Sequence, residues 1–250
     1  MTNKYKYFVA NWKMFGDIKT VNSINNVIKM SKSRKYNKAK IIYCPPYTLL
    51  DTFVKKLTKT KLDVGAQNCH QSISSGSFTG CINSKMIKNL GCKYVIIGHS
   101  ENRNSGDTDL LINNKIKSAL ERNLKVLFCI GENIKDKRSH KTKRILINQI
   151  KRGLKKIKNI KNIIIAYEPV WSIGTGIVPK QNELLNNILF IKNFLRKNFK
   201  YKNTRVLYGG SVSPKNIKDL SKINQIDGFL IGGASQNSNK FIDIIKKTFN

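Results

Sequence analysis

The carboxylate of Glu168 stands where an apolar run meets a glycine-rich loop. Residues 163–166 lack polar alternation, and this pattern predicts a strand buried on both faces, as in a parallel sheet. Partial desolvation at a strand end raises the pKa of a carboxyl and makes it a better base near neutral pH. Glu168 is therefore a candidate proton-transfer base. The structural alternative is a strand-end carboxylate that only binds loop amides.

Three further polar side chains follow apolar runs and could take part in the same chemistry. His99 can donate a hydrogen bond to a carbonyl oxygen, Lys13 offers a positive charge, and Asn11 can orient a substrate oxygen. Each has a structural alternative, namely a core histidine, one lysine among many, or an asparagine that caps a turn. Together with Glu168 they supply a base, a neutral donor and a cation.

Glycine pairs follow the last two apolar runs. Gly209 and Gly210 precede Ser211, and Gly232 is followed by Gly233. Backbone N–H groups at such positions can point into a concavity at a helix start, which is how parallel barrels hold phosphate. One pair alone usually marks a tight turn, but two pairs after successive strands are more specific for a phosphate site.

Eight short runs rich in β-branched or aromatic residues recur along the chain, each followed by polar or glycine residues and then a helical pattern. They predict strands over 5–10, 40–44, 62–66, 94–98, 125–130, 163–167, 206–208 and 228–231. Helical spacing joins Ile18, Val21, Ile24 and Ile28, then Leu110, Leu111, Ile116 and Leu120, then Leu185, Ile188, Leu189 and Phe194. Asp17 before Ile18, and Ser213 before Pro214, are typical helix starts.

Eight βα units predict an α/β fold, a single closed (β/α)8 barrel of eight parallel strands with outer helices. The length of 250 residues suits one such domain over 1–250, and no linker or composition break divides it. A doubly wound open sheet is the alternative, but no G-x-G-x-x-G follows the first strand. In a barrel the carboxyl ends of the strands share one face, so the candidate residues are expected to converge there.

The net charge of +33, from 47 Lys and Arg against 14 Asp and Glu, could indicate a nucleic-acid or anionic partner. The lysines are spread over nearly every predicted helix, however, and this favours a solvated basic surface or attraction of a small anionic substrate. Polar Asn11 and Lys13 interrupt the first apolar stretch too early for a signal peptide or membrane span. We expect a soluble, cytoplasmic protein.

The five cysteines and three histidines do not form a metal-binding pattern. The cysteines are odd in number and include no C-x-x-C pair, and the histidines include no H-x-x-x-H pair. Buried thiols in a reducing compartment are the preferred interpretation, and no metal site is expected.

From residue 8 to residue 234 the chain resembles the triosephosphate isomerase family. The matching segments, in order, are 10–13 (ANWK), 65–69 (GAQNC), 78–80 (FTG), 98–101 (GHSE), 129–132 (CIGE), 166–171 (AYEPVW), 173–176 (IGTG), 208–212 (YGGSV) and 228–235 (GFLIGGAS). Their joint order and spacing carry the resemblance. It implies a TIM barrel that interconverts dihydroxyacetone phosphate and D-glyceraldehyde 3-phosphate through an enediol(ate), in glycolysis and gluconeogenesis, without a cofactor.

The resemblance also implies roles for individual residues. Glu168 would move the proton, neutral His99 would polarise the carbonyl, and Lys13 would stabilise negative charge, a pairing of base and imidazole known for this family. Asn11 would position substrate and Glu101 would support the site near Lys13. Asn11 and Lys13 would bind substrate, and backbone donors at Gly174, Ser211, Gly232 and Gly233 would hold its phosphate.

A closing lid is implied after the catalytic strand, where it would keep water from the enediolate. It would comprise Pro169, Val170, Trp171, Ser172, Ile173, Gly174, Thr175, Gly176, Ile177, Val178, Pro179 and Lys180. The family usually has lysine where this chain has Ile177. We expect altered closure kinetics with unchanged chemistry.

A homodimer is also implied, with Phe78, Thr79 and Gly80 in a loop that brings Thr79 near the partner's Asn11 and His99. The family usually carries a glutamate and an arginine, paired between subunits, where this chain has Cys81 and Asn102. Loss of both leaves no buried charge unmatched, so the dimer is still expected.

Two other function classes are compatible with parts of the pattern. A phosphate-binding barrel lyase or aldolase would need a desolvated lysine on an inner strand, whereas Lys13 follows the first strand. A basic nucleic-acid-binding barrel without turnover would show salt-dependent retention on DNA.

Overall fold

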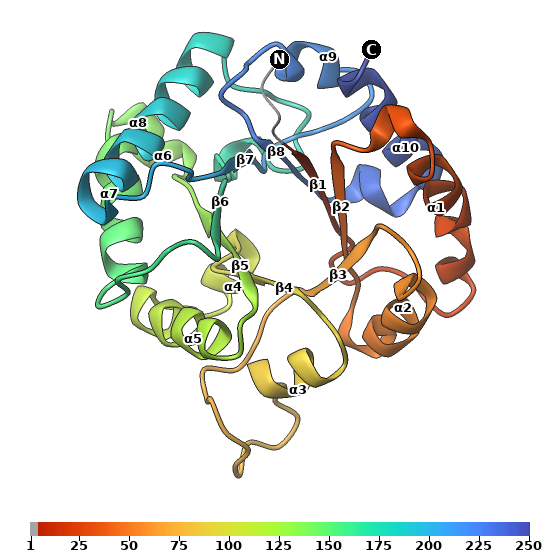
Figure 1. Ribbon diagram of the computed structural model, residues 1–250. Helices are drawn as coiled ribbons and strands as arrows, with labels where there is room; N and C mark the ends of the chain where they lie inside the picture. The colour runs from red at the N-terminus through yellow and green to blue at the C-terminus, as the bar shows by residue number, and fades with distance from the viewer. Residues whose placement is uncertain (1–4) are drawn as a thin grey trace.

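The computed structural model describes residues 5–250, and within them eight parallel strands close into a barrel in the order in which they follow in the sequence. Figure 1 shows the ring of strands with the helices outside it. The strands are β1 (Lys6–Asn11), β2 (Ala39–Cys44), β3 (Asp63–Ala66), β4 (Tyr94–Ile97), β5 (Lys125–Ile130), β6 (Ile163–Tyr167), β7 (Val206–Tyr208) and β8 (Gly228–Ile231). The (β/α)8 prediction is confirmed, and each predicted strand agrees within one residue at either end.

Helices follow the strands and cover the outside of the barrel. The α-helices are α1 (Asn25–Ser31), α2 (Leu50–Leu57), α3 (Ser84–Asn89), α4 (Ser100–Asn104), α5 (Asp109–Glu121), α6 (Ile134–Arg138), α7 (Thr142–Gly153), α8 (Gln181–Phe199), α9 (Ile217–Ser221) and α10 (Ser238–Thr248). Short 3-10 turns are η1 (Thr20–Ile24), η2 (Arg34–Tyr36), η3 (Tyr47–Leu49), η4 (Val170–Ser172) and η5 (Gly233–Gln236). No helix in residues 5–250 is long and apolar enough to cross a membrane.

Alternate residues of each strand face the barrel interior or the helices, because strand side chains have a period of two. The interior set forms its own apolar cluster and includes Val9, Ile96 and Leu127. A larger cluster lies between the strands and the helices and includes Phe8, Phe128 and Phe229. Because both faces of every strand are covered, the strands read as continuous apolar runs.

Most residues of the expected helical stripes are buried or pack against the barrel, but the first residue of two stripes does neither. Ile18 is 74 % exposed and Leu110 is 71 % exposed, although both were expected to face the strands. Ile112 takes the buried place in α5, and in α8 the fully buried positions include Leu184 and Ile188. The patterns contained more apolar residues than one helix face can bury, so spacing alone did not select the register.

Both expected helix starts lie upstream of the observed ones. The Asp17 carboxylate accepts a hydrogen bond from the Thr20 N–H at 2.8 Å, and the helical conformation begins at Thr20. Ser213 and Pro214 begin a turn, and α9 starts later, at Ile217. In each case the polar side chain closes a local turn before the helix.

The cysteine interpretation agrees with the structure. All five cysteines are free, and Cys44, Cys69, Cys92 and Cys129 are buried, whereas Cys81 is exposed. Burial raises the pKa of Cys69 to about 12, so this thiol stays protonated at neutral pH.

The corrected helix register gives a stability prediction. Ile112→Ala should lower the free energy of unfolding by about 2–5 kcal/mol, because it opens a cavity in a packed core. Leu110→Ala, on the solvent side of the same helix, should change it by less than about 0.5 kcal/mol. Urea unfolding followed by circular dichroism checks both variants, and similar losses for the two would contradict the observed register.

Candidate active site

A cavity of about 530 Å³ opens at the carboxyl ends of the strands and gathers most of the candidate residues. We call it the catalytic cavity. Its lining includes Asn11, Lys13, His99, Glu168, Gly174, Ser211, Gly232 and Gly233. These residues lie up to 222 positions apart in the chain, and barrel closure brings them together as expected.

Glu168 follows β6 and is almost completely buried, with 2 % of its side chain exposed. Burial raises the pKa of its carboxyl above the ordinary value of 4.5. Smaller effects oppose the shift: His99, a hydrogen bond from the Ser100 backbone N–H, the Cys129 thiol and the positive charge of Lys13. The site thus holds a desolvated carboxylate among several donors, as a base near neutral pH requires.

His99 is a buried residue at the N-terminus of α4, and its hydrogen bonds define its tautomer. The Glu101 backbone N–H donates to Nδ1 of His99 at 3.3 Å, so Nδ1 is the acceptor in a neutral imidazole. The proton then lies on Nε2, which is 3.3 Å from Oε1 of Glu168. The imidazole can therefore donate into the catalytic cavity from the atom that faces the carboxylate.

Lys13 lies in a tightly held loop after β1. Its backbone has φ of +56°, in the left-handed region that is uncommon outside glycine. The Gln67 side-chain amide donates to the Lys13 carbonyl at 2.8 Å and to the Cys44 carbonyl at 2.9 Å. Lys13 Nζ is paired with Glu101 Oε1 at 2.5 Å, so Glu101 supports Lys13 from beside the cavity instead of lining it.

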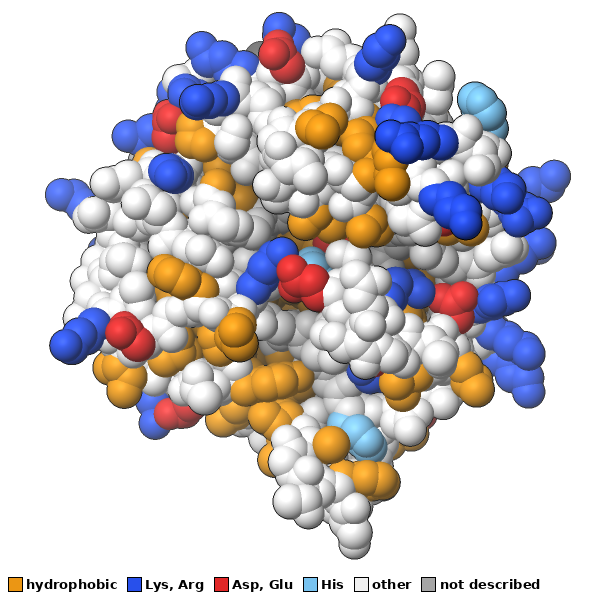
Figure 2. Space-filling view, turned by 180° about the vertical axis from the view of Figure 1, so that it is seen from behind, with side chains coloured by type: hydrophobic (Ala, Val, Ile, Leu, Met, Phe, Trp, Pro, Cys, Tyr) orange, Lys and Arg blue, Asp and Glu red, His pale blue; other side chains and the backbone are white. Residues whose placement is uncertain are grey.

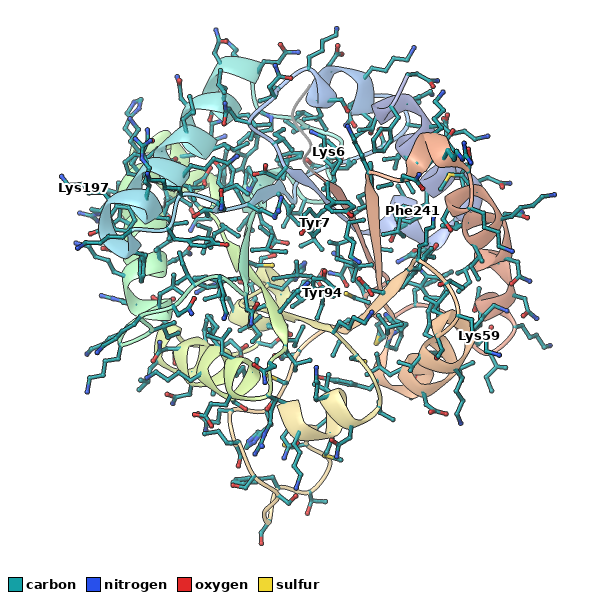
Figure 3. All side chains as sticks on the ribbon, in the orientation of Figure 1. Lys6, Tyr7, Lys59, Tyr94, Lys197 and Phe241 are labelled. Atoms are coloured by element: carbon teal, nitrogen blue, oxygen red, sulfur yellow. The ribbon has the colours of Figure 1, made fainter. Side chains whose placement is uncertain are left out.

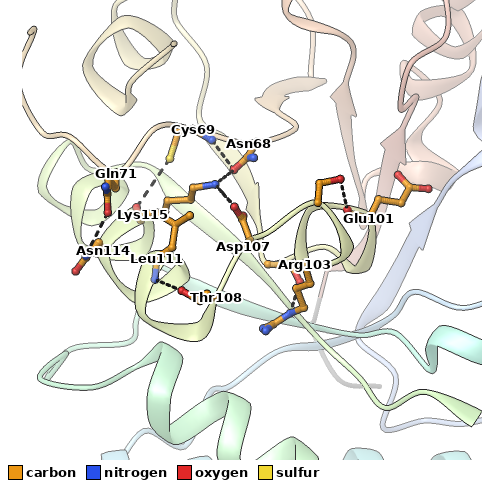
Figure 4. A network of polar contacts seen from close by, with 12 residues as sticks. Asn68, Cys69, Gln71, Glu101, Arg103, Asp107, Thr108, Leu111, Asn114 and Lys115 are labelled. Atoms are coloured by element: carbon orange, nitrogen blue, oxygen red, sulfur yellow. Dashed lines mark hydrogen bonds and ion pairs between the residues drawn. The ribbon is translucent and has the colours of Figure 1, made fainter. Parts of the chain in front are cut away.

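Hydrogen bonds of Arg103, which is drawn in Figure 4, fix the segment that follows β4 and carries His99. The Arg103 guanidinium donates to the Gly98 carbonyl at 2.8 Å and to the Cys129 carbonyl at 3.3 Å, and it pairs with Asp109 at 2.8 Å. These bonds join the ends of β4 and β5 to the start of α5. Sequence reasoning missed Arg103, although a charged residue just after the His99 motif was a usable signal.

Two glycines keep space around the backbone and side chain of Glu168. A Cβ atom at Gly209 would lie 2.7 Å from Cγ of Glu168. A Cβ atom at Gly131 would overlap the Glu168 carbonyl oxygen. The glycine expected to help a phosphate loop therefore also makes room for the base.

The segment 169–180 is anchored at its start by Glu132, another residue with no assigned role at the sequence level. Glu132 is fully buried, and burial raises the pKa of its carboxyl. It accepts hydrogen bonds from Trp171 Nε1 at 2.9 Å and from the Tyr167 hydroxyl at 3.2 Å, and the Glu132 carbonyl accepts from the Val170 N–H at 2.9 Å. Lys137 Nζ lies 3.6 Å from the centre of the Trp171 ring.

Ser172 links the two ends of this segment to the glycine loop after β7. Its hydroxyl donates to the Ile177 carbonyl at 2.6 Å, lies 2.9 Å from the Tyr208 hydroxyl, and accepts from the Ser211 N–H at 3.2 Å. The tip between these bonds is exposed, with Gly174 and Gly176 at positive φ and Ile177 57 % exposed. Fixed ends with an exposed tip are the arrangement expected of a loop that moves as one body.

The residues expected at a dimer interface lie beside the catalytic cavity or in a protruding loop. Phe78, Thr79, Gly80 and Cys81 are exposed, in the loop between β3 and α3 that projects from the barrel in Figure 1. Asn102 lines a second cavity of about 220 Å³, together with Asn11, Lys13 and His99. We call this the docking cavity.

Figure 2 shows Lys and Arg side chains around the rim of this face, more numerous than the carboxylates between them. A small anion would therefore approach a positive surface. In the described range 5–250, no group of three or more His, Cys, Asp or Glu side chains is placed to hold a metal ion.

Comparison with known proteins identifies what the chain is similar to. A family model described as triosephosphate isomerase matches residues 6–248. The chain is 39 % identical over 245 residues to a triosephosphate isomerase from Thermodesulfovibrio yellowstonii, covering 96 % of this chain and 98 % of that protein. It is 40 % identical over 245 residues to one from Neurospora crassa, covering 96 % and 97 %. A crystal structure of triosephosphate isomerase from Bartonella henselae matches with a TM-score of 0.88 and 31 % identity, covering 97 % and 98 %.

The Ser172 contacts predict how firmly the segment is held. Ser172→Ala removes all three side-chain bonds, so backbone amides between Trp171 and Val178 should exchange with deuterium severalfold faster. Hydrogen exchange with mass spectrometry measures this directly. Ser139→Ala, at an exposed site, is the control, and an unchanged rate in Ser172→Ala would show that the hydroxyl does not restrain the segment.

Proposed function

The chain belongs to the triosephosphate isomerase family, and from this premise we propose how its own residues carry out the reaction. The enzyme interconverts dihydroxyacetone phosphate and D-glyceraldehyde 3-phosphate. One observation carries the proposal: the desolvated carboxylate of Glu168 faces Nε2 of His99 across 3.3 Å at the edge of the catalytic cavity. Both groups can then reach one substrate at adjacent carbon and oxygen atoms.

Glu168 is proposed as the base. Its carboxylate takes a proton from the carbon beside the substrate carbonyl, the C–H electron pair forms the carbon–carbon double bond, and the carbonyl π electrons move to oxygen. The hydroxyl proton on the first carbon's oxygen then passes to the former carbonyl oxygen, and Glu168 returns its proton to the former carbonyl carbon. The carbonyl group now lies on the first carbon, and the other isomer is formed. The raised pKa of Glu168 suits both halves of this cycle, because the carboxylate must accept and then release the same proton.

His99 and Lys13 are proposed to stabilise the charge that develops on oxygen. The N–H at Nε2 of His99 can donate to the carbonyl oxygen, and the ammonium of Lys13 supplies positive charge in the same cavity. Asn11 is buried, and its carboxamide oxygen accepts from the Lys13 backbone N–H at 3.1 Å, so it fixes the loop while it lines the cavity. The pair formed by Glu101 keeps Lys13 oriented.

The phosphate is proposed to bind at the glycine loops. Gly232 caps the η5 turn and Gly233 is its first residue, so their N–H groups stand at a helical start where an anion is favoured. Ser211 and Gly174 complete the cradle on the other side of the cavity. The substrate would thus be held at one end while its other end meets Glu168.

Residues 169–180 are proposed as the lid over the reacting atoms. Ile173 and Gly174 from this segment already line the catalytic cavity, and the Glu132 and Ser172 bonds define its two ends. A closed lid would exclude water from the enediolate and so limit phosphate loss. Ile177 has no charged side chain at the tip, so closure with altered kinetics stays a prediction.

We propose a homodimer in which the loop carrying Phe78 and Thr79 enters the partner's docking cavity. That cavity is lined by Asn11, Lys13 and His99, so an inserted loop would cover the back of the catalytic residues. Cys81 and Asn102 provide no ion pair there, so the association would depend on shape and apolar contact. We also propose a single domain over 1–250 and a cytoplasmic location.

Glu168→Gln tests the base. The variant keeps the size of the side chain but cannot accept the proton, so kcat should fall by about 10²–10⁴. Glu121→Gln, at the exposed end of α5, is the matched control and should keep full activity. A coupled isomerase assay checks both, and comparable turnover in Glu168→Gln would disprove the assignment.

The same site predicts the acid limb of the pH profile. The base works only when deprotonated, so kcat/KM should fall as pH drops through the pKa of Glu168 in the free enzyme. Because burial raises that pKa, the midpoint should lie above pH 4.5. Steady-state rates from pH 4 upward measure it.

Phe78→Asp tests the dimer. Phe78 is 49 % exposed at the projecting loop, and a carboxylate there would be buried without a partner on association. Sedimentation should change from twice 28.5 kDa to one chain, with a loss of activity. Ile134→Asp, which likewise places a carboxylate on an exposed apolar residue but in α6, is the control. A wild type that is fully active as a monomer at assay concentration would contradict the proposal.

A further inference from the structure

A third cavity, of about 760 Å³, opens at the other end of the barrel. Its lining includes Asp63, Tyr94 and Lys125, the first residues of β3, β4 and β5, whereas the catalytic cavity lies beyond the last residues of the strands. We call it the amino-end cavity. It shares no lining residue with the catalytic cavity, and the isomerase reaction gives it no role.

The charges that line the amino-end cavity are unbalanced. Its single carboxylate, Asp63, is 3 % exposed and pairs with Lys40 at 2.5 Å and with Lys93 at 2.8 Å. Against it stand five cations: Lys40, Lys61, Lys93, Lys125 and Arg205. Lys40 and Lys93 therefore share one carboxylate, and the other three cations have no carboxylate among the residues that line the cavity.

Lys125 and Arg205 have open hydrogen-bonding capacity. Within residues 5–250 neither side chain makes an ion pair, and residues 1–4 contain no Asp or Glu that could supply one. Each cation lies instead over an aromatic ring. Nζ of Lys125 is 5.4 Å from the centre of Tyr94, and Cζ of Arg205 is 5.3 Å from the centre of Tyr7. A ring face does not occupy the N–H donors, so these remain available.

Tyr94 adds a buried donor at the same place. Its side chain is fully buried, and its hydroxyl has no hydrogen-bond partner among the described residues. Figure 3 shows Tyr94 and Tyr7 inside the ring of strands. A buried hydroxyl left without a partner costs free energy, and most such groups in proteins are satisfied. The unused hydroxyl therefore indicates a missing acceptor.

The direction of the pKa shift of Lys125 also indicates excess positive charge in the amino-end cavity. The pKa of Lys125 is lowered, first by burial and then by the positive charge of Lys40, with Lys93 and Arg205 acting in the same direction. Cations that repel one another in a partly desolvated pocket are stabilised by an anion between them.

We propose that the amino-end cavity is a second anion site, which binds a small phosphate-bearing ligand through Lys125, Arg205 and the Tyr94 hydroxyl. Phosphate oxygens accept from all three donor types, and a guanidinium offers a planar pair of N–H groups that matches them. The donors come from the first residues of β4 and β5 and from the residue just before β7, so the barrel holds their backbone in fixed positions. The inference does not depend on the roles proposed for Glu168, His99 and Lys13.

Calorimetric titration with inorganic diphosphate at low ionic strength tests the site. Lys125→Gln and Arg205→Gln should each weaken binding at this site by at least about tenfold, since each removes a charged hydrogen bond. Lys135→Gln removes one charge at an exposed position of α6 and should have little effect. An equal loss in Lys135→Gln would show that the binding is only diffuse attraction to a basic surface and would overturn the proposal, as would no binding to the wild type.

Tyr94→Phe is the sharper variant because it changes no charge. It should weaken diphosphate binding about threefold to tenfold, as expected for one neutral hydrogen bond. The inhibition constant of diphosphate against substrate reports the catalytic cavity and should stay unchanged in this variant and in Lys125→Gln. Unchanged calorimetric affinity in Tyr94→Phe, or parallel shifts in the inhibition constant, would refute a separate built site.

A second titration, with a sugar bisphosphate in place of diphosphate, distinguishes the two sources of the phosphate group. Tighter binding of the sugar compound would identify an organic phosphate as the ligand, and tighter binding of diphosphate would identify an inorganic one. Failure of both compounds to bind would overturn the anion site while leaving the isomerase assay of Glu168→Gln to be judged separately.

Discussion

The burial of the Glu168 carboxylate is the constraint on which the rest of the site depends. A carboxylate removed from water must either be compensated or become neutral. Here the compensation comes from His99, the Ser100 N–H, the Cys129 thiol and Lys13, which belong to the ends of β4, β5 and β1. Only a closed barrel brings those strand ends to one point. The pKa is raised and yet limited, because desolvation and these donors act in opposite directions.

The second layer of residues exists to hold those donors still. Arg103 ties β4 to β5 near His99, Gln67 ties the Lys13 loop to β2, and Glu132 holds the start of the segment 169–180. Each of the three is polar, and each bonds backbone carbonyls or a side chain that the sequence alone does not place nearby. These bonds tie three separate loops to the strand ends around the cavity.

The strands and the convergence of Asn11, His99 and Glu168 on one cavity could be predicted from the sequence because both follow simple rules. Strands buried on both faces are continuous apolar runs, and parallel topology sends Asn11, His99 and Glu168 to one face. The helix registers could not be predicted from the sequence. Leu110 and Ile112 are both apolar, and only packing against the barrel determines that Ile112 is buried and Leu110 exposed. The hydrogen-bond partners of Gln67, Arg103 and Glu132 could not be predicted either, because they depend on the paths of the loops. The sequence does not distinguish Lys125 and Arg205 from its other Lys and Arg residues, 47 in all. Only the structure shows that both line one cavity.

The hydroxyl of Ser172 connects the segment 169–180 to the backbone N–H of Ser211. It has one hydrogen and two lone pairs, and contacts to the Ile177 carbonyl, the Tyr208 hydroxyl and the Ser211 N–H use all three. An oxyanion can accept from the Ser211 N–H only if the Ser172 hydroxyl stops accepting from it. Binding of the anion at this N–H and loss of one hydrogen bond to the segment 169–180 would therefore occur together. The Ser211 N–H would keep one acceptor throughout, whereas the Ser172 hydroxyl would lose one of its three contacts.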